Sequence, residues 1–223
     1  MSIELKEQVD DAAVEAFAEK VLADYAGANA FFMASIGDRL GIFEDLAEGP
    51  ATTEELAART GLQERYVREW LGGMAAAGYV DYDPTTVSYS LPAERVPVLA
   101  EEAGPAFFGC AFFDFSTNFG ETYHRLLDAF RAGGGVSQES YGAEVAESIE
   151  RFTAPWFEHM LVELWLPEMP AVATKLQEGA FVCDVGCGRG RAVIKLALAF
   201  PKATFVGIDV YEPAVRAGEQ AAE

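Results

Sequence analysis

The sequence predicts a mainly α-helical N-terminal part, a helical connector and then the first part of an α/β domain. Three observations support this fold class. Apolar residues recur at helical spacing from residue 3 to about 48. Residues 50–91 have the order helix, turn, helix, hairpin, and residues 181–209 have the order strand, glycine turn, helix, strand. We expect three regions along the chain: 1–98, 99–176 and 177–223.

The composition is that of a globular protein with a strongly acidic surface. The 223 residues carry a formal net charge of −20, and 51% of them are hydrophobic. Such a surface repels phosphate backbones and anionic lipid headgroups. The charge therefore argues against nucleic acid as the main partner and against a membrane surface.

Neither targeting nor metal binding is indicated by the sequence. The N-terminal stretch MSIELKEQVDDAAVEAF lacks the basic and apolar regions of a signal peptide. The apolar run PAFFGCAFFDF is shorter than the roughly 18 residues that a membrane span needs. Cys110, Cys183 and Cys187 form no disulfide framework, and no further metal ligands accompany them. We expect reduced thiols in a cytoplasmic protein without a metal site.

The N-terminal region predicts two helices with unusually apolar surfaces. Val14, Phe17 and Val21 recur at helical spacing, and GANAFFMASIGDRLGIFEDLAEGP predicts a second helix ending near Gly41. A helix that is apolar over so much of its surface needs a large partner, either the rest of the domain or a second subunit. We expect a homodimer formed through these helices.

Residues 50–91 predict a winged-helix-like unit. Thr52 and Glu55 form a capping box, and Gly61 ends the short helix that follows. A second helix should end at Gly78, and YVDYDPTTVSYSL predicts a hairpin around an Asp-Pro turn. The expected buried face of the second helix consists of Tyr66, Val67, Trp70, Leu71 and Met74.

The charge of this unit does not fit DNA binding. Residues 52–91 contain three basic and six acidic residues, and the hairpin has no Lys or Arg. A module that reads DNA needs several cations facing phosphates. We therefore expect the winged helix to serve packing and dimerisation.

Residues 99–177 are rich in aromatic side chains and predict two helices separated by the glycine loop RAGGGVSQES. The aromatic residues form either the wall of a helical core or part of an apolar substrate pocket. His124 and His159 are the two histidines, and each could accept a proton. Both lie beside aromatic residues on predicted helices, so a packed or surface position is expected for each.

The segment GAFVCDVG predicts a strand that is apolar on both faces, which is typical of a central parallel strand. GCGRG, the helix RAVIKLALAF and the strand PKATFVGID follow, and the last strand ends at Asp209. In such a βαβ unit the glycines let a ligand approach the backbone, and the free amides at the helix start favour an anionic group. Asp209 lies 19 residues after Gly190, where a carboxylate can bind both ribose hydroxyls.

The spacing of the glycines distinguishes between nucleotide ligands. In a dinucleotide motif the third glycine position would fall on Arg191, which is too bulky for close packing of helix and strand. The triphosphate-binding pattern with its lysine is absent. The pattern that remains is D-x-G-x-G-x-G, formed by Asp184, Gly186, Gly188 and Gly190.

This pattern resembles the cofactor turn of class I S-adenosylmethionine-dependent methyltransferases. The resemblance implies that Asp184 and the three glycines, with Cys187 between the first two, hold the methionine part of S-adenosyl-L-methionine. It also implies that Asp209 binds the ribose and that Val210 contacts the adenine. A βαβ unit without a ligand is the alternative.

The order of the three regions resembles that of small-molecule O-methyltransferases with an N-terminal winged-helix-like dimerisation domain. The segment FEHM, residues 157–160, lies where such enzymes carry a Phe and a Met near the cofactor. The resemblance implies methyl transfer to a small apolar or aromatic acceptor by direct displacement, with alignment and exclusion of water supplied by the protein.

The family's sheet has further strands, whereas this chain has room for two strands after residue 180. The Rossmann-like domain is therefore expected to be incomplete and the chain alone unable to complete a methyl transfer. Two alternatives stay open: a ligand-sensing transcriptional regulator, and a non-catalytic protein that dimerises and binds a small molecule.

Overall fold

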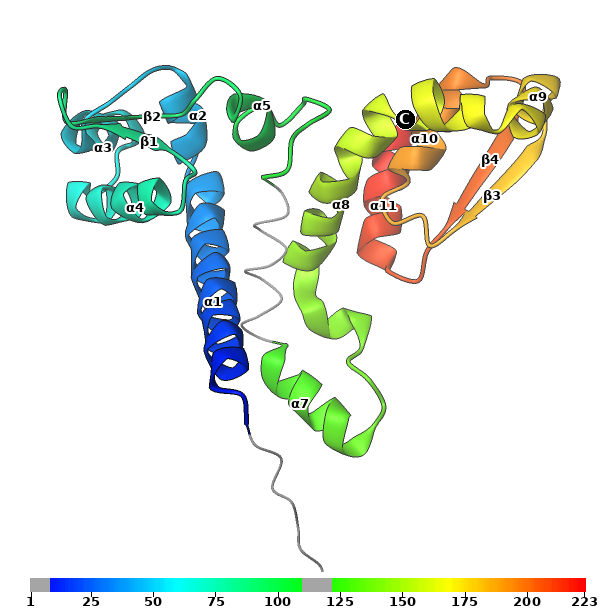
Figure 1. Cartoon of the computed structure of the whole chain (residues 1–223). Helices are drawn as coiled ribbons and strands as arrows, with labels where there is room; N and C mark the ends of the chain where they lie inside the picture. The colour runs from blue at the N-terminus through cyan, green and yellow to red at the C-terminus, as the bar shows by residue number, and fades with distance from the viewer. Residues whose placement is uncertain (1–8, 110–121) are drawn as a thin grey trace, which may run out of the picture.

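We analysed a computed structural model of the protein, which describes residues 9–109 and 122–223 (Figure 1). A winged-helix unit lies at one end of the molecule, and a two-stranded parallel sheet with its helices lies at the other. The long helix α8 runs between them. The expected order of a helical N-terminal part, a helical connector and the first part of an α/β unit is confirmed.

The first helix, α1 (Asp11–Arg39), is continuous. Its N-cap is Asp10, whose side chain accepts a hydrogen bond from the Ala12 amide. The prediction of two separate helices in this stretch was wrong. Gly27 weakens a helix by only about 1 kcal/mol relative to alanine, and no proline interrupts the segment. Figure 1 shows the N-terminal half of α1 projecting beyond the winged-helix unit.

The winged-helix unit contains four short helices and a hairpin. The helices are α2 (Ile42–Ala47), α3 (Thr53–Thr60), α4 (Glu64–Ala76) and α5 (Val96–Leu99). The hairpin pairs β1 (Asp81–Asp83) with β2 (Ser88–Ser90) in antiparallel register. The capping box of Thr52 and Glu55 is present, and Gly61 and Gly78 both have positive φ after their helices. The sequence prediction of this unit is therefore confirmed.

The core of the winged-helix unit is built around Trp70. Its ring packs edge-on against Phe43, and its indole N–H donates to the Met33 carbonyl oxygen at 2.7 Å. A Cβ at position 37 of α1 would collide with the Trp70 ring, so this close approach requires Gly37. The other large side chains with almost no exposed surface are Ile42, Phe43, Leu46, Leu56, Val67, Leu71, Met74 and Val80.

One residue of the predicted buried face was assigned wrongly. Tyr66 is 76% exposed, whereas Val67, Trp70, Leu71 and Met74 are buried. The buried residues follow the i, i+3, i+4, i+7 spacing, and Tyr66 lies about 100° around the helix from Val67.

The connector consists of helices of different kinds. Among its described residues the first helix after α5 is α7 (Tyr123–Ala132), and the longest is α8 (Gly142–His159). The loop between them carries three consecutive glycines with positive φ, as the sequence predicts. After α8 come a π-helical segment (Leu161–Trp165), a 3₁₀ turn (Leu166–Glu168) and α9 (Pro170–Glu178). A 3₁₀ turn (Gln138–Tyr141) precedes α8. The first aromatic helix was predicted to begin at residue 106, but residues 106–109 are not helical. Cys110 and residues 111–121 of that prediction lie outside the described residues.

The C-terminal unit is a βαβ arrangement followed by one more helix. β3 (Phe181–Val185) pairs in parallel with β4 (Thr204–Ile208), and α10 (Arg191–Ala199) connects them. The last helix is α11 (Glu212–Ala222). The predicted strand, turn, helix and strand are confirmed.

The expected burial of β3 was wrong. Within the part of the chain that the structure describes, β3 has one neighbouring strand, and Phe181 and Val185 are 72% and 80% exposed. A strand is covered on both faces only where helices and further strands surround it.

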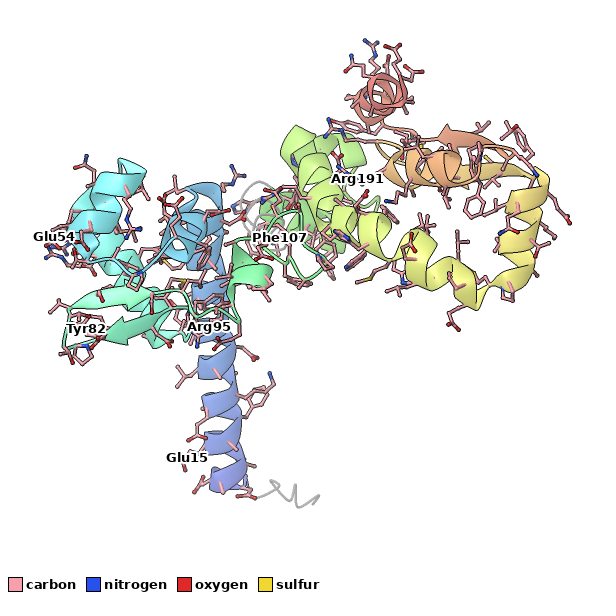
Figure 2. All side chains as sticks on the ribbon, turned by 90° about the horizontal axis from the view of Figure 1, so that it is seen from above. Glu15, Glu54, Tyr82, Arg95, Phe107 and Arg191 are labelled. Carbon is pink, nitrogen blue, oxygen red and sulfur yellow. The ribbon has the colours of Figure 1, made fainter. Side chains whose placement is uncertain are left out.

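Helix α8 makes ionic and aromatic contacts with the N-terminal unit. The Arg151 guanidinium donates to both carboxylate oxygens of Asp38, at 2.9 and 3.1 Å, and to Glu102 at 2.9 Å. The same guanidinium lies 5.7 Å from the centre of the Phe107 ring. Figure 2 shows Phe107 where the N-terminal unit meets α8.

No helix among residues 9–109 and 122–223 is both long enough and apolar enough to cross a bilayer.

Candidate functional site

The glycine turn after β3 is held in place by backbone hydrogen bonds. Gly186, Gly188 and Gly190 all have positive φ, of 86°, 55° and 72°. The amides of Gly186 and Cys187 both donate to the Ile208 carbonyl oxygen at the end of β4, at 2.7 and 3.1 Å. Side chains other than hydrogen are strained in this conformation, so the three glycines allow the turn. Around Gly186 and Gly188 a Cβ would meet no atom within 4 Å, which leaves room for a ligand.

Asp209 at the end of β4 is tied to this turn. Its carboxylate accepts hydrogen bonds from the amides of Gly188, at 2.7 Å, and Tyr211, at 2.8 Å. The Tyr211 amide first, and then the Gly188 amide, lower the pKa of the Asp209 carboxyl below its ordinary value. A carboxylate has about four acceptor positions, so two stay available for the hydroxyls of a ribose.

A cavity of about 320 Å³ lies between this turn and α8. The α8 side is formed by Ile149, Glu150, Thr153 and Phe157. The other side includes Asp184, Gly186, Cys187, Gly188, Arg189, Arg191, Ala192, Asp209, Tyr211 and Ala214. The cavity is therefore bounded by the carboxyl ends of two parallel strands, where ligands bind in open α/β sheets.

The structure brings most of the predicted cofactor residues to this cavity. Asp184, Gly186, Cys187, Gly188 and Asp209 all line it. Gly190 is not among the lining residues; it is the N-cap of α10, and its positive φ joins the turn to that helix.

Val210 lies differently from its expected place. It is 90% exposed and is not among the lining residues, whereas the next residue, Tyr211, is. Contact of Val210 with adenine stays a prediction.

Cys187 is a half-buried free cysteine at the edge of the cavity. Burial, followed by the nearby carboxylates of Asp184 and Asp209, raises the pKa of its thiol. A Cβ at position 207 of β4 would lie 2.7 Å from the Cys187 sulfur. Gly207 therefore makes space for this side chain, a role that no motif in the sequence indicates.

Two further groups shape the turn and were missed by sequence reasoning. On one side, a Cβ at position 218 of α11 would lie 2.7 Å from the Arg189 carbonyl oxygen, so Gly218 lets α11 approach the turn. On the other side, Glu150 of α8 pairs with both Arg189 and Arg191. Figure 2 shows Arg191 beside α8. The only sequence signal for this cluster is the pair of arginines flanking Gly190.

The histidines lie at packed or surface positions, as expected. His159 Nε2 lies 2.8 Å from the Ala103 carbonyl oxygen, a contact between α8 and the N-terminal unit. His124 is exposed on α7, with its ring against Tyr123. Of the FEHM segment, Phe157 lines the cavity, and Met160 lies at the C-terminal end of α8.

Comparison with protein families finds matches to two separate segments of the chain. Residues 28–101 match a family described as an Rv2258c-like winged HTH domain. Residues 176–223 match a family described as a methyltransferase domain. No curated protein sequence matches the chain significantly.

Solved structures similar to the chain include several methyltransferases. A mitomycin 7-O-methyltransferase is 22% identical with a TM-score of 0.66, and the match covers 95% of this chain and 63% of that one. A putative O-methyltransferase from Nostoc punctiforme is 15% identical with a TM-score of 0.63, covering 97% and 61%. Human N-acetylserotonin methyltransferase is 20% identical with a TM-score of 0.60, covering 100% and 65%.

The chain thus spans less than two thirds of the length of these structures. At these identities the likeness establishes the fold. Residues 28–101 are thus similar to a winged helix-turn-helix domain and residues 176–223 to a methyltransferase domain, and the chain has the fold of the corresponding part of these solved structures.

Proposed function

We propose that the chain is the N-terminal part of an S-adenosylmethionine-dependent methyltransferase that acts on a small apolar or aromatic acceptor. We also propose its division into a dimerisation domain, residues 1–98, a connector, residues 99–176, and part of the cofactor domain, residues 177–223. The observation that carries the proposal is the Asp209 carboxylate, which is bonded to the Gly188 amide at a cavity covered by α8.

The residues at the cavity suit the chemical groups of this cofactor. The positive-φ glycines leave open space beside the backbone, where the methionine part fits. Asp209 has free acceptor positions for the ribose hydroxyls. When bound, the cofactor supplies a methyl group that its sulfonium activates. Phe157 and Ile149 of α8 line the cavity and would shield a bound cofactor from water on that side and help to align it.

The acceptor class is inferred from the aromatic side chains next to α8. Phe152 packs edge-on against both Phe108 and Trp156, with ring centres 5.4 and 4.7 Å apart. Apolar and aromatic walls are typical of sites for small molecules. Two of the similar structures are named for mitomycin and N-acetylserotonin, which supports a small organic acceptor.

We further propose that the protein forms a homodimer through α1. Residues 11–29 of this helix are exposed along their whole length. The exposed apolar side chains on this stretch are Val14, Phe17, Val21, Leu22 and Tyr25, each at least 50% accessible. Covering such a face requires a partner, and a second copy of the helix offers the same apolar surface.

The arginines of the winged-helix unit make contacts within the protein. Arg65 and Arg68 on α4 pair with Glu69 and Glu64 of the same helix. Arg59 donates to backbone carbonyl oxygens of residues 45, 49 and 50, and Arg95 pairs with Asp81. These contacts favour packing over phosphate binding as the role of these arginines.

Calorimetric titration with S-adenosylhomocysteine tests the proposed function. We expect saturable binding to the wild-type protein and a loss of at least tenfold in affinity for Asp209→Ala, because a hydrogen-bonded charged group is worth about 1.5–3 kcal/mol. Asp128→Ala, at an exposed position on α7, is the matched control and should bind normally. A flat titration of the wild-type protein would refute the proposal.

A further inference from the structure

Glu150 is the one cavity-lining carboxylate that comes from the connector rather than from the βαβ unit. Its side chain is 20% exposed, and its two carboxylate oxygens contact different partners. One oxygen accepts from Arg189, and the other accepts from Arg191 at 2.9 Å. A single residue of α8 thus holds the two side chains that flank Gly190.

The glycine turn is consequently fixed from two sides. Gly218 of α11 approaches the Arg189 carbonyl oxygen, and Glu150 holds the arginine side chains from α8. Gly190 between the arginines has a φ of 72° and begins α10. Because the turn forms one side of the cavity, the Glu150 contacts help to hold that side in place.

Glu150 also sets the charge of the cavity. Its lining contains three carboxylates, from Glu150, Asp184 and Asp209, and two guanidinium groups, from Arg189 and Arg191. The cavity therefore carries one negative charge in excess. With a neutral residue at position 150 the excess disappears.

The two forms of the proposed cofactor differ by one charge. The methyl donor has a sulfonium, an ammonium and a carboxylate, which leaves one positive charge at pH 7. S-adenosylhomocysteine lacks the sulfonium charge and is neutral overall. A cavity with one excess negative charge therefore binds the donor more tightly than the product at close range, where salt screening is incomplete.

We propose that Glu150 is a positioning and specificity-determining residue, which holds the glycine turn through Arg189 and Arg191 and favours the cationic methyl donor over its neutral product. This inference rests on the proposed function. On this proposal, helix α8 contributes to the preference for the methyl donor over its product. A weaker affinity for the product also reduces product inhibition.

The test compares two ligands by calorimetry. S-adenosylhomocysteine is the neutral probe, and sinefungin, a stable analogue with an ammonium group in place of the sulfonium, is the cationic probe. Glu150→Gln removes the charge but keeps an oxygen that accepts hydrogen bonds from the arginines. We expect this variant to reduce the preference for sinefungin over S-adenosylhomocysteine by about threefold to tenfold.

Glu158→Gln is the matched control. Glu158 also lies on α8 and pairs with a cation of α10, Lys195, at 2.6 Å. It does not line the cavity at the glycine turn but a neighbouring one, which Glu150, Arg189 and Arg191 also line. This variant should leave the ratio of the two affinities unchanged. Glu150→Ala, which releases both arginines, should weaken the binding of both probes, and Glu150→Asp should preserve the preference.

The outcomes separate the two proposals. If the wild-type protein binds neither probe, the proposed function fails and this inference fails with it. If both probes bind and Glu150→Gln leaves their affinity ratio unchanged, or Glu158→Gln changes the ratio equally, the role of Glu150 is refuted while the proposed function stands.

Discussion

The contact between Asp38 and Arg151 offers a quantitative test of how the connector is attached to the N-terminal unit. The Asp38 side chain has no exposed surface, and Arg151 has 24%. Removing one partner of a buried ion pair costs about 3–5 kcal/mol where the other charge is left without compensation. Here Glu102 still pairs with Arg151, which places the expected cost at the lower end of that range. Asp38 lies in the last turn of α1, where a negative charge interacts unfavourably with the helix dipole. Replacing the carboxylate with an amide removes this interaction and offsets the loss of stability by about 0.3–1 kcal/mol.

Asp38→Asn should therefore destabilise the protein by about 2–4 kcal/mol. Urea unfolding followed by tryptophan fluorescence measures this loss, since Trp70 lies in the core that α1 completes. With a slope of about 1–3 kcal/mol per molar urea, the midpoint should fall by about 0.7 M or more. Changing both Asp38 and Arg151 to apolar residues should recover most of the loss, because no buried charge is left alone.

Asp128→Asn is the matched control for this experiment. Asp128 pairs with Arg131 on α7, and both side chains are more than 70% exposed. Exposed pairs contribute about 0–1 kcal/mol, so this variant should unfold almost like the wild type. Equal losses for the two variants, or a loss below about 1 kcal/mol for Asp38→Asn, would refute the reasoning.

Three further predictions concern separate parts of the molecule. Burial raises the pKa of the Glu44 carboxyl, so its contribution to stability is present below the unfolded pKa and is lost as the pH rises through the folded pKa. Glu44→Gln should therefore be more stable than the wild type at pH 7. Thermal unfolding at pH 7 and below pH 4 should show this difference disappear in acid. Gly207→Ala should lower the melting temperature through its collision with the Cys187 sulfur, and Cys187→Ala in the same chain should restore it; failure of this rescue would contradict the packing argument. The double variant Phe17→Glu and Leu22→Glu should be monomeric by light scattering, whereas a wild-type monomer would contradict dimerisation through α1.

Local signals in the sequence were sufficient for much of the fold. The capping box at Thr52 and the glycine at position 61 fix the ends of α3 through backbone geometry that neighbouring residues determine. The glycine turn and Asp209 were found for the same reason, because their spacing within a βαβ unit places them together.

Contacts between distant segments could not be predicted in the same way. Glu150 lies 39 residues before Arg189, and no periodicity relates the two positions. Asp38 and Arg151 are 113 residues apart, and each looks like an ordinary surface charge in its own helix. The burial of β3 was overestimated because apolar residues show that a strand can be buried, but they do not show which other strands or helices cover it.

Glu150 and Arg151 are consecutive residues of α8 that contact opposite ends of the protein. Consecutive side chains on an α-helix project about 100° apart, so Glu150 faces the glycine turn while Arg151 faces Asp38. A rotation of α8 about its own axis would stretch the contacts of both residues together. The two neighbouring charges therefore fix the rotation of α8 about its axis. Any motion of the two units relative to each other would have to occur at other segments of the chain.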